Sequence, residues 1–259
     1  MGKIIAVANQ KGGVGKTTTS VNLAASLAAT RHRVLLVDLD PQGNATMGCG
    51  VDKKHLPLST YEVLTRRSTA RDAIVMLGDV GFHLLPGNSD LTAASVELLQ
   101  MEDRERALAQ ALEACRGDYD YLLIDCPPSL NMLTLNALVA ADSVLIPMQC
   151  EYYALEGLTD LLDTVRNIRN TVNPELGIEG LLRTMYDPRN RLTNEVSEQL
   201  TKHFADKLLR TFIPRNIRLA EAPSHGLPVL LYDKASTGAL AYLALAGEIV
   251  RRNGKAASP

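Results

Sequence analysis

The sequence is poor in aromatic residues: Phe, Trp and Tyr make up only 4% of its 259 positions, and tryptophan is absent. A core without large rings has to be filled by Leu, Ala, Val and Ile, and hydrophobic residues as a whole reach 46%. Parallel sheets buried under helices on both faces have this composition. Because a chain of this length can bury one large core, we expect a single domain.

Cysteine is scarce and shows no pattern. The four cysteines, Cys49, Cys115, Cys126 and Cys150, form no C-x-x-C pair and have no regular spacing. Metal and redox sites need thiols that converge, whereas an isolated cysteine is commonly a small buried apolar residue. We expect four reduced, structural thiols, and the pattern argues against an iron–sulfur electron carrier.

Long hydrophobic runs are also missing, since none approaches the roughly 20 residues of a membrane-spanning helix. The segment NGKAASP at 253–259 has no bulky apolar residue from which an amphipathic membrane anchor could be built. We therefore expect a cytoplasmic protein with no membrane partner. Residues 1–252 should form the domain and residues 253–259 a disordered tail.

Short apolar runs alternate with amphipathic stretches along the chain. Apolar runs lie at 3–9, 33–40, 119–128 and 143–149, and helical stretches at 16–29, 103–115 and 154–170. This rhythm predicts an α/β fold of three layers, with a mainly parallel, twisted sheet and helices on both faces. Such sheets bind ligands at the carboxyl ends of their strands, where the motifs below fall.

The strongest motif is the glycine-rich loop KGGVGKTT, which follows the first predicted strand and opens the first predicted helix. Backbone N–H groups and the positive end of a helix favour an anion there, and a triphosphate fits. Lys16 would reach the β and γ oxygens of ATP, and the Thr17 hydroxyl would bind Mg²⁺. The predicted ATP-binding residues of the loop are Lys11, Gly12, Gly13, Val14, Gly15, Lys16, Thr17 and Thr18.

The loop departs from the common phosphate-loop pattern, which requires glycine five residues before Gly15, where this chain has Gln10 followed by Lys11. In this form it resembles the deviant Walker A motif of the ParA/MinD superfamily of P-loop NTPases, marked by a second, signature lysine. The resemblance implies that two ATP-bound subunits form a sandwich dimer and that Lys11 crosses to the partner's nucleotide. A cation delivered there stabilises the charge developing on the phosphoryl group, so we expect Lys11 and Lys16 to be catalytic.

Three acidic residues close predicted strands beside this loop. Asp38 and Asp40 project to the same side because side chains alternate along a strand, and Asp125 ends the run YLLID. The resemblance assigns Asp40 to positioning the attacking water, as a catalytic residue. It places Asp38 in the magnesium shell, and Asp125 resembles the Walker B acid, so Thr17, Asp38 and Asp125 are the expected metal site.

The second half of the chain contains a local excess of basic residues. The formal net charge is -2 overall, yet residues 181–220 hold eight basic and four acidic residues and are therefore +4. A cationic face on an acidic protein indicates sequence-independent contact with DNA phosphates, although a solvated charged face would look similar.

The segments QCEYYALEGL, TMYDPRNRLT and IPRNIRLAEAPSHGLPV resemble the chromosomal ParA, or Soj, proteins, and the resemblance covers nearly the whole chain. It implies that Arg189 and Arg218 bind non-specific double-stranded DNA. It also implies that Pro214 and Asn216 contact adenine, which would couple the nucleotide state to the neighbouring Arg218.

The function implied by the resemblance is that of a slow ATP hydrolase that segregates a chromosome or plasmid. It would work on the nucleoid as an ATP-bound homodimer, with a ParB-type centromere-binding partner that stimulates hydrolysis. Two alternatives share the ATPase: a ParA-like positioner of protein cargo on the nucleoid, and a MinD-like membrane-associated ATPase of the division site. The sequence barely separates the first, and the polar end at 253–259 argues against the second.

Overall fold

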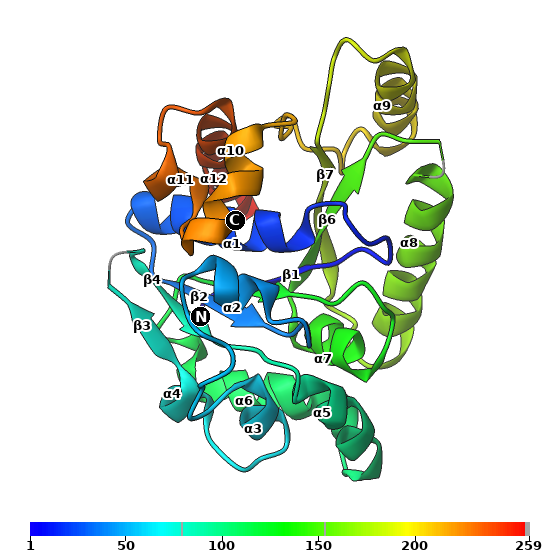
Figure 1. Ribbon diagram of the computed structural model, residues 1–259. Helices are drawn as coiled ribbons and strands as arrows, with labels where there is room; N and C mark the ends of the chain where they lie inside the picture. The colour runs from blue at the N-terminus through cyan, green and yellow to red at the C-terminus, as the bar shows by residue number, and fades with distance from the viewer. Residues whose placement is uncertain (79, 153, 257–259) are drawn as a thin grey trace.

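The computed structural model describes residues 1–78, 80–152 and 154–256. Its sheet has seven strands in the order β3-β4-β2-β5-β1-β6-β7 (Figure 1). Neighbouring strands are parallel except β3 and β4, which form an antiparallel pair at one edge. The strands are β1 (Lys3–Val7), β2 (Val34–Asp38), β3 (Val75–Leu77), β4 (Phe82–Leu85), β5 (Tyr121–Asp125), β6 (Ser143–Gln149) and β7 (Gly177–Thr184).

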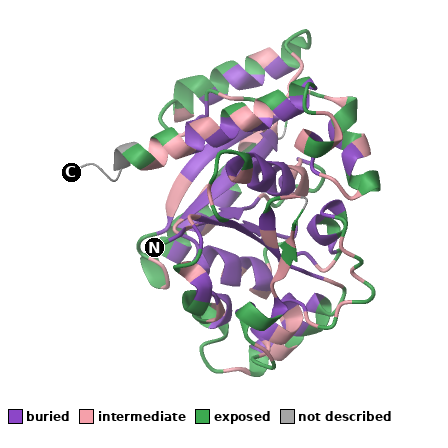
Figure 2. Ribbon diagram, turned by 90° about the vertical axis from the view of Figure 1, so that its left-hand side faces the viewer, coloured by how far each residue is buried: buried purple, intermediate pink, exposed green. Residues whose placement is uncertain are grey.

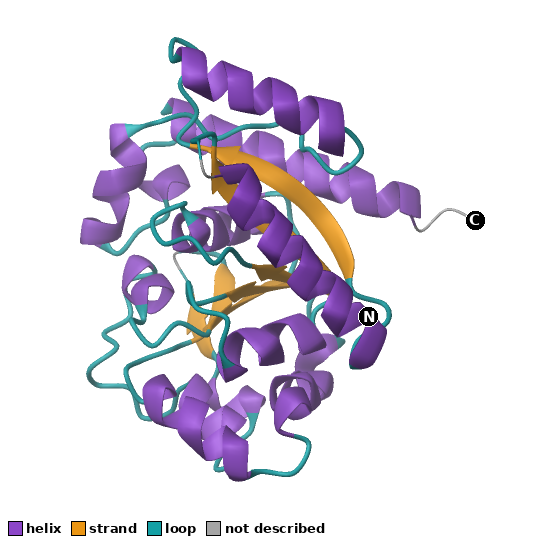
Figure 3. Cartoon of the chain, turned by 90° about the vertical axis from the view of Figure 1, so that its right-hand side faces the viewer, coloured by secondary structure: helices purple, strands orange, loops and turns teal. Residues whose placement is uncertain are grey.

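Helices cover both faces of this sheet. They are α1 (Lys16–Ala29), α2 (Asn44–Gly48), α3 (Thr60–Leu64), α4 (Ala70–Ala73), α5 (Leu91–Glu97), α6 (Ala107–Arg116), α7 (Met132–Ala140), α8 (Ala154–Thr171), α9 (Arg191–Phe204), α10 (Ile217–Glu221), α11 (Val229–Tyr232) and α12 (Thr237–Ala256), with short 3₁₀ turns at 98–100, 104–106 and 222–225. Figure 3 shows helices on either side of the twisted strands.

The alternation of side chains along each strand divides the core into two layers. In β1, Ile4 and Ala6 belong to the hydrophobic cluster covered by α3 to α9, whereas Ile5 and Val7 belong to the one covered by α1, α2 and α10 to α12. The strands are consequently buried on both faces, while exposed residues lie on the outer sides of the helices (Figure 2). The predicted three-layer α/β fold is confirmed, and all four cysteines are free and buried.

The end of the chain differs from the expectation of a tail that begins at residue 253. Helix α12 continues through Ala256: its buried apolar residues contact the core as far as Ile249, and beyond them the Asn253 side chain accepts a hydrogen bond from the Lys3 ammonium. The rest of the expected tail, 257–259, lies outside the described residues. Within the described part, no helix combines the length and apolar character needed to cross a membrane.

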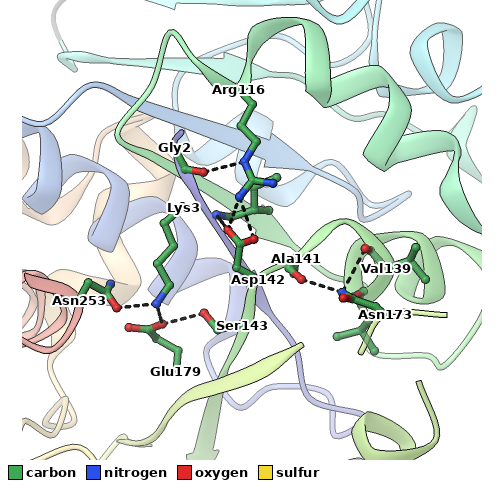
Figure 4. A network of polar contacts seen from close by, with 12 residues as sticks. Gly2, Lys3, Arg116, Val139, Ala141, Asp142, Ser143, Asn173, Glu179 and Asn253 are labelled. Carbon is green, nitrogen blue, oxygen red and sulfur yellow. Dashed lines mark hydrogen bonds and ion pairs between the residues drawn. The ribbon is translucent and has the colours of Figure 1, made fainter. Parts of the chain in front are cut away.

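A polar network fastens the amino ends of the strands, at the sheet edge opposite the glycine-rich loop (Figure 4). Glu179 of β7 is buried, and it accepts a hydrogen bond from the Ser143 hydroxyl at 2.7 Å and pairs with the Lys3 ammonium at 2.7 Å. Lys3 also donates to the Asn253 side chain of α12. Glu179 therefore joins β7 to β6 through Ser143 and to β1 through Lys3, and Lys3 in turn connects these strands to α12.

A second ion pair closes the same edge. The Arg116 guanidinium donates to both Asp142 oxygens at 2.8 and 2.7 Å, and to the carbonyl oxygen of Gly2 at 2.8 Å. Asp142 in turn accepts the backbone N–H of Ile4 at 2.7 Å. The start of β1, the strand that leads into the glycine-rich loop, is thus held by Glu179 through the Lys3 side chain and by Arg116 and Asp142 through its backbone.

Glu179→Ala should lower the free energy of unfolding by roughly 2 kcal/mol, because it leaves the Lys3 ammonium and the Ser143 hydroxyl without their carboxylate partner. The cost should be below that of a fully buried pair because Lys3 is 30% exposed. Urea denaturation of the nucleotide-free protein measures it. Asp160→Ala, on an exposed position of α8, is the control and should change stability by less than about 0.5 kcal/mol. Equal losses in both variants would contradict the role of the network.

Candidate nucleotide site

The glycine-rich loop joins β1 to α1 at the carboxyl edge of the sheet. Gly13 and Gly15 have positive φ angles of 74° and 85°, which a residue without Cβ adopts at little cost. Gly15 is the N-cap of α1, and no side chain caps the helix. The first N–H groups of a 14-residue helix therefore stay available to an anion, which the helix dipole also attracts.

Lys16 lies inside this turn. It is buried, and its Nζ donates to the carbonyl oxygen of Lys11 at 3.1 Å, so the loop wraps around its own lysine. Burial lowers the pKa of Lys16, while the nearby carboxylates of Asp125 and Asp40 act in the opposite direction. The Lys16 ammonium therefore lies beside the helix terminus at which a phosphate would bind.

Asp125 fastens α1 to the sheet. Its two oxygens accept hydrogen bonds from the hydroxyls of Thr17 and Ser20, each at 2.8 Å. The carboxyl group is fully buried, and this burial, together with the charge of Asp38, raises its pKa to about 8 against the opposing effect of the two hydroxyl bonds. Thr17 and Asp125, both predicted metal residues, are in direct contact.

Asp38 and Asp40 have different surroundings despite their spacing. Asp38 is fully buried: its Oδ2 accepts the Thr46 N–H at 2.8 Å and hydroxyl at 2.7 Å, and its Oδ1 accepts the Asp40 N–H at 3.2 Å. Burial raises the pKa of Asp38 in spite of these bonds. Both oxygens are therefore occupied, Oδ2 by Thr46 of α2 and Oδ1 by the backbone of Asp40, so Asp38 fixes that helix to the end of β2.

Asp40 keeps one oxygen free of the chain. Its Oδ1 accepts the Gln42 N–H at 2.9 Å, and no contact within the described residues involves its Oδ2. An oxygen of this kind can orient a water molecule. Among the described residues, no group of three or more His, Cys, Asp or Glu side chains is arranged to hold a metal ion, so an ion at Thr17 and Asp125 would need oxygen ligands from phosphate and water.

A cavity of about 300 Å³ opens beside the loop, and its lining is mainly apolar. The structure brings Pro214 and Asn216, predicted to contact adenine, together with Gly15 and Thr18 of the loop. The other lining residues are Thr184, Met185, Ile213, Arg215, Leu219, Ala220 and Tyr242. A flat, mostly apolar ring suits such a lining, with polar groups at its rim.

Two lining residues that the sequence did not reveal hold the cavity to the loop. The Thr184 hydroxyl at the end of β7 donates to the Val14 carbonyl oxygen at 2.8 Å, and the Tyr242 hydroxyl of α12 lies 3.2 Å from the Thr19 hydroxyl of α1. The order of strands offered a signal for Thr184, which ends a parallel strand at the same edge. Nothing local in the sequence marks Tyr242.

The side chains of Lys11 and Lys16 lie in different environments. The Lys11 side chain is 44% exposed and its ammonium pairs with Glu151, whereas the Lys11 backbone N–H donates to the Asn9 side chain at 2.9 Å. The two lysines of the loop therefore point to different surroundings, one buried beside Asp125 and one at the surface.

The two predicted DNA-binding arginines lie outside the cavity lining. Arg189 is 89% exposed and makes an ion pair with Asp187 at 2.8 Å, and Arg189 holds the pKa of Asp187 down to about 2. Arg218 is 50% exposed and pairs with Glu221 at 2.7 Å and Asp233 at 3.3 Å. Both guanidinium groups are accessible, and both already have acidic partners.

A mainly parallel sheet with a glycine-rich loop at the carboxyl end of the interior strand β1, a buried loop lysine and a Thr–Asp pair defines a P-loop NTPase, here with the deviant loop. Comparison with known proteins narrows this class. The family described as "AAA domain" matches residues 2–178, more than half of the chain.

The sequence relatives match along nearly the full chain. An uncharacterized protein of Pseudomonas putida KT2440 is 66% identical over 97% of this chain and 96% of its own. The sporulation initiation inhibitor protein Soj of Bacillus subtilis is 54% identical over 96% of this chain and 98% of its own. The chromosome partitioning protein ParA of Caulobacter vibrioides is 49% identical over 96% and 94%. The chain belongs to the ParA/Soj family of chromosome-partitioning ATPases.

Solved structures agree with the fold. A Mycobacterium smegmatis protein described as cobyrinic acid a,c-diamide synthase, with bound ATP analog and magnesium, superposes with a TM-score of 0.85, at 40% identity over 97% of this chain and 95% of its own. The cell division ATPase MinD of Pyrococcus furiosus superposes with a TM-score of 0.81, at 27% identity over 97% and 99%.

Asp125→Asn should raise the unfolding temperature of the nucleotide-free protein by a few degrees at pH 8 and by less at pH 5. The folded pKa of Asp125 is above that of an unfolded aspartate, roughly 4, so its contribution to stability falls as the pH rises from that value through about 8. Asparagine does not titrate and removes one of three carboxylates near a single lysine.

Thermal unfolding at the two pH values measures the difference between variant and wild type. Asp118→Asn, which changes an exposed carboxylate paired with Arg71, is the matched control and should show no such dependence on pH. A benefit of Asp125→Asn that is equal at both pH values would contradict the buried charge as its cause.

Proposed function

We propose that this chain binds and hydrolyses ATP with Mg²⁺ as an ATP-dependent sandwich dimer. The observation that carries the proposal is the separation of the two loop lysines. Lys16 is buried at the helix terminus, whereas the Lys11 side chain stands at the surface and shares with Lys16 only a bond through its backbone carbonyl. A surface cation on a phosphate loop is suited to a phosphate of a second subunit.

Each of the chain's own groups has a role in this proposal. The N–H groups at the start of α1 and the Lys16 ammonium bind the phosphates, and the Thr17 and Asp125 oxygens hold the ion. When bound, Mg²⁺ neutralises charge on the β and γ oxygens. Asp40 orients the attacking water through its free oxygen, and Pro214 and Asn216 contact adenine in the cavity. Asp38, whose oxygens are both occupied, serves the ion indirectly by fixing α2.

We further propose that the dimer binds DNA without sequence preference through Arg189 and Arg218 and segregates a chromosome or plasmid on the nucleoid. A ParB-type protein stimulates its otherwise slow hydrolysis. Two exposed arginines per subunit support this, and so do the names of the relatives at 54% and 49% identity. We also propose a single ATPase domain, as expected for residues 1–252, since the described strands form one sheet, and we extend it to the end of α12 at Ala256.

Two alternatives keep the same ATPase. A positioner of protein cargo would use the same dimer and DNA surface, so the identity of the cargo decides between them. A MinD-like membrane ATPase shares the fold, but identity to the MinD structure is 27%, against 54% to Soj. We therefore place it behind the DNA-segregating function.

Lys11→Ala and Asp40→Ala should each abolish ATP hydrolysis, and an equal mixture of the two should recover about a quarter of the wild-type rate. Half of the dimers in the mixture are mixed, and in each of these one site has both its own Asp40 and the partner's lysine. Steady-state phosphate release at rising protein concentration measures the recovery. A mixture as inactive as the separate variants would show that Lys11 acts in its own subunit.

DNA binding should require ATP and weaken steeply with salt. Four arginines per dimer neutralise about four phosphates, which gives a log–log salt slope of roughly -3.6. Arg218→Ala and Arg189→Ala should each reduce the slope by about 1.8 and leave dimerisation with ATP unchanged. Fluorescence anisotropy of a labelled non-specific duplex measures the slope, with Arg166→Ala on α8 as a control for charge alone. Retention of duplex DNA by the nucleotide-free protein at full strength would overturn the proposal.

A further inference from the structure

Arg218 is enclosed by acidic groups from two neighbouring segments. Its Nη1 donates to Glu221 Oε2 at 2.7 Å within α10, and its Nε lies 3.3 Å from Asp233 Oδ2, directly after α11. The Tyr232 hydroxyl donates to the same Glu221 oxygen at 3.2 Å, which fixes that carboxylate in place. We call Arg218, Glu221, Tyr232 and Asp233 the arginine clamp.

The charge of the clamp opposes the function expected of Arg218. One guanidinium with two carboxylates has a net charge of -1, and oxygens at these distances occupy positions that DNA phosphate oxygens would take. All three side chains are between 35% and 50% exposed, so the pairing is weak enough to be displaced. In this conformation the two carboxylates shield the Arg218 guanidinium from DNA.

Arg189 lacks a clamp of this kind. Its one acidic partner, Asp187, stands two residues away on the same turn, and the arginine is 89% exposed. The Arg189–Asp187 contact therefore does not connect Arg189 to a neighbouring helix, as the contact with Asp233 does for Arg218. The two predicted DNA-binding arginines therefore differ in how far the rest of the fold controls them.

The clamp shares a helix with the adenine cavity. In α10, Leu219 and Ala220 line the cavity, and Asn216, its N-cap, both lines the cavity and donates to the Thr237 hydroxyl of α12 at 2.8 Å. Figure 1 shows α10 beside α11 and α12, on the side of the sheet that carries α1. Because α10 has only five residues, it has no long contact surface to resist a shift.

We propose that Glu221 and Asp233 hold Arg218 away from DNA until a nucleotide fills the cavity and moves α10, so that these two acids make the contact of Arg218 with DNA depend on bound nucleotide. The inference rests on the proposed function, because it requires that Arg218 contacts DNA. Glu221 and Asp233 are positioning residues that act through Arg218. Opening the clamp exchanges two carboxylates of the chain for phosphates of the duplex.

The test compares DNA affinity in three states: with ATP, with ADP and without nucleotide. In the double variant Glu221→Gln, Asp233→Asn, affinity without nucleotide should rise about fivefold, and affinity with ADP or ATP, which both place adenine in the cavity, by less than about twofold. Tyr232→Phe should change affinity in the same direction but more weakly. Adding Arg218→Ala to the double variant should remove the gain. Anisotropy of a labelled non-specific duplex at one fixed salt concentration gives all these values.

The double variant Glu195→Gln, Asp163→Asn is the matched control, since it also removes two negative charges, from exposed ion pairs with Arg191 on α9 and Arg166 on α8. A general effect of negative charge should raise affinity equally in the three states, as we expect for this control. If the double variant also does so, or if its gain persists after Arg218→Ala, the clamp is refuted. If Arg218→Ala alone leaves ATP-dependent DNA binding unchanged, the proposed DNA surface is wrong and the clamp has nothing to control.

Discussion

The site depends on the attachment of the first helix to the neighbouring strand through one buried carboxylate. Asp125 at the end of β5 accepts hydrogen bonds from Thr17 and Ser20, one turn apart on α1. This aims the helix terminus, with its uncapped N–H groups and Lys16, along the carboxyl edge of the sheet. The positive φ angle of Gly15 lets the chain enter the helix from that edge. Strand, loop and helix are thereby fixed to one another before any ligand binds.

Four cations at the site and on the proposed DNA surface are in contact with acceptors of the same chain. Lys16 donates to a loop carbonyl, Lys11 pairs with Glu151, Arg189 with Asp187, and Arg218 with two acids. Lys16 needs such a partner because a buried cation without one is costly, whereas the other three are exposed and their pairs can be displaced. This explains why the excess of basic residues at 181–220 does not by itself describe the surface. Each ligand has to compete with a carboxylate or carbonyl that is already in place.

The sequence was sufficient for features with a local pattern. The strands are apolar runs, the loop is marked by its glycines, and Asp125 follows a strand whose end had to lie at the same edge, so the α/β fold and the Thr17–Asp125 contact could be predicted. Contacts between segments that are distant in the sequence could not be predicted. The resemblance places Asp38 in the magnesium shell, which stays a prediction, but the spacing of Asp38 and Asp40 does not reveal that Thr46 of α2 donates two hydrogen bonds to Asp38. Tyr242 lines the cavity only because α12 returns across α1, 223 residues after Thr19. The edge strand at 75–77 and its neighbour at 82–85 lack a strong period. Helix α12 outlasts the expected boundary at 252 where Asn253 is held by Lys3, a partner so distant in the sequence that no local pattern reveals it.

Helix α12 is fastened at two widely separated points. Near its start the Tyr242 hydroxyl meets Thr19 beside the cavity, and near its end Asn253 accepts a bond from Lys3 at the opposite edge of the sheet. We expect a helix held at both ends to rotate little when the cavity fills, and therefore to act as a fixed wall of the cavity. The proposed movement on nucleotide binding then falls to the short helix α10, for which α12 is a stationary surface.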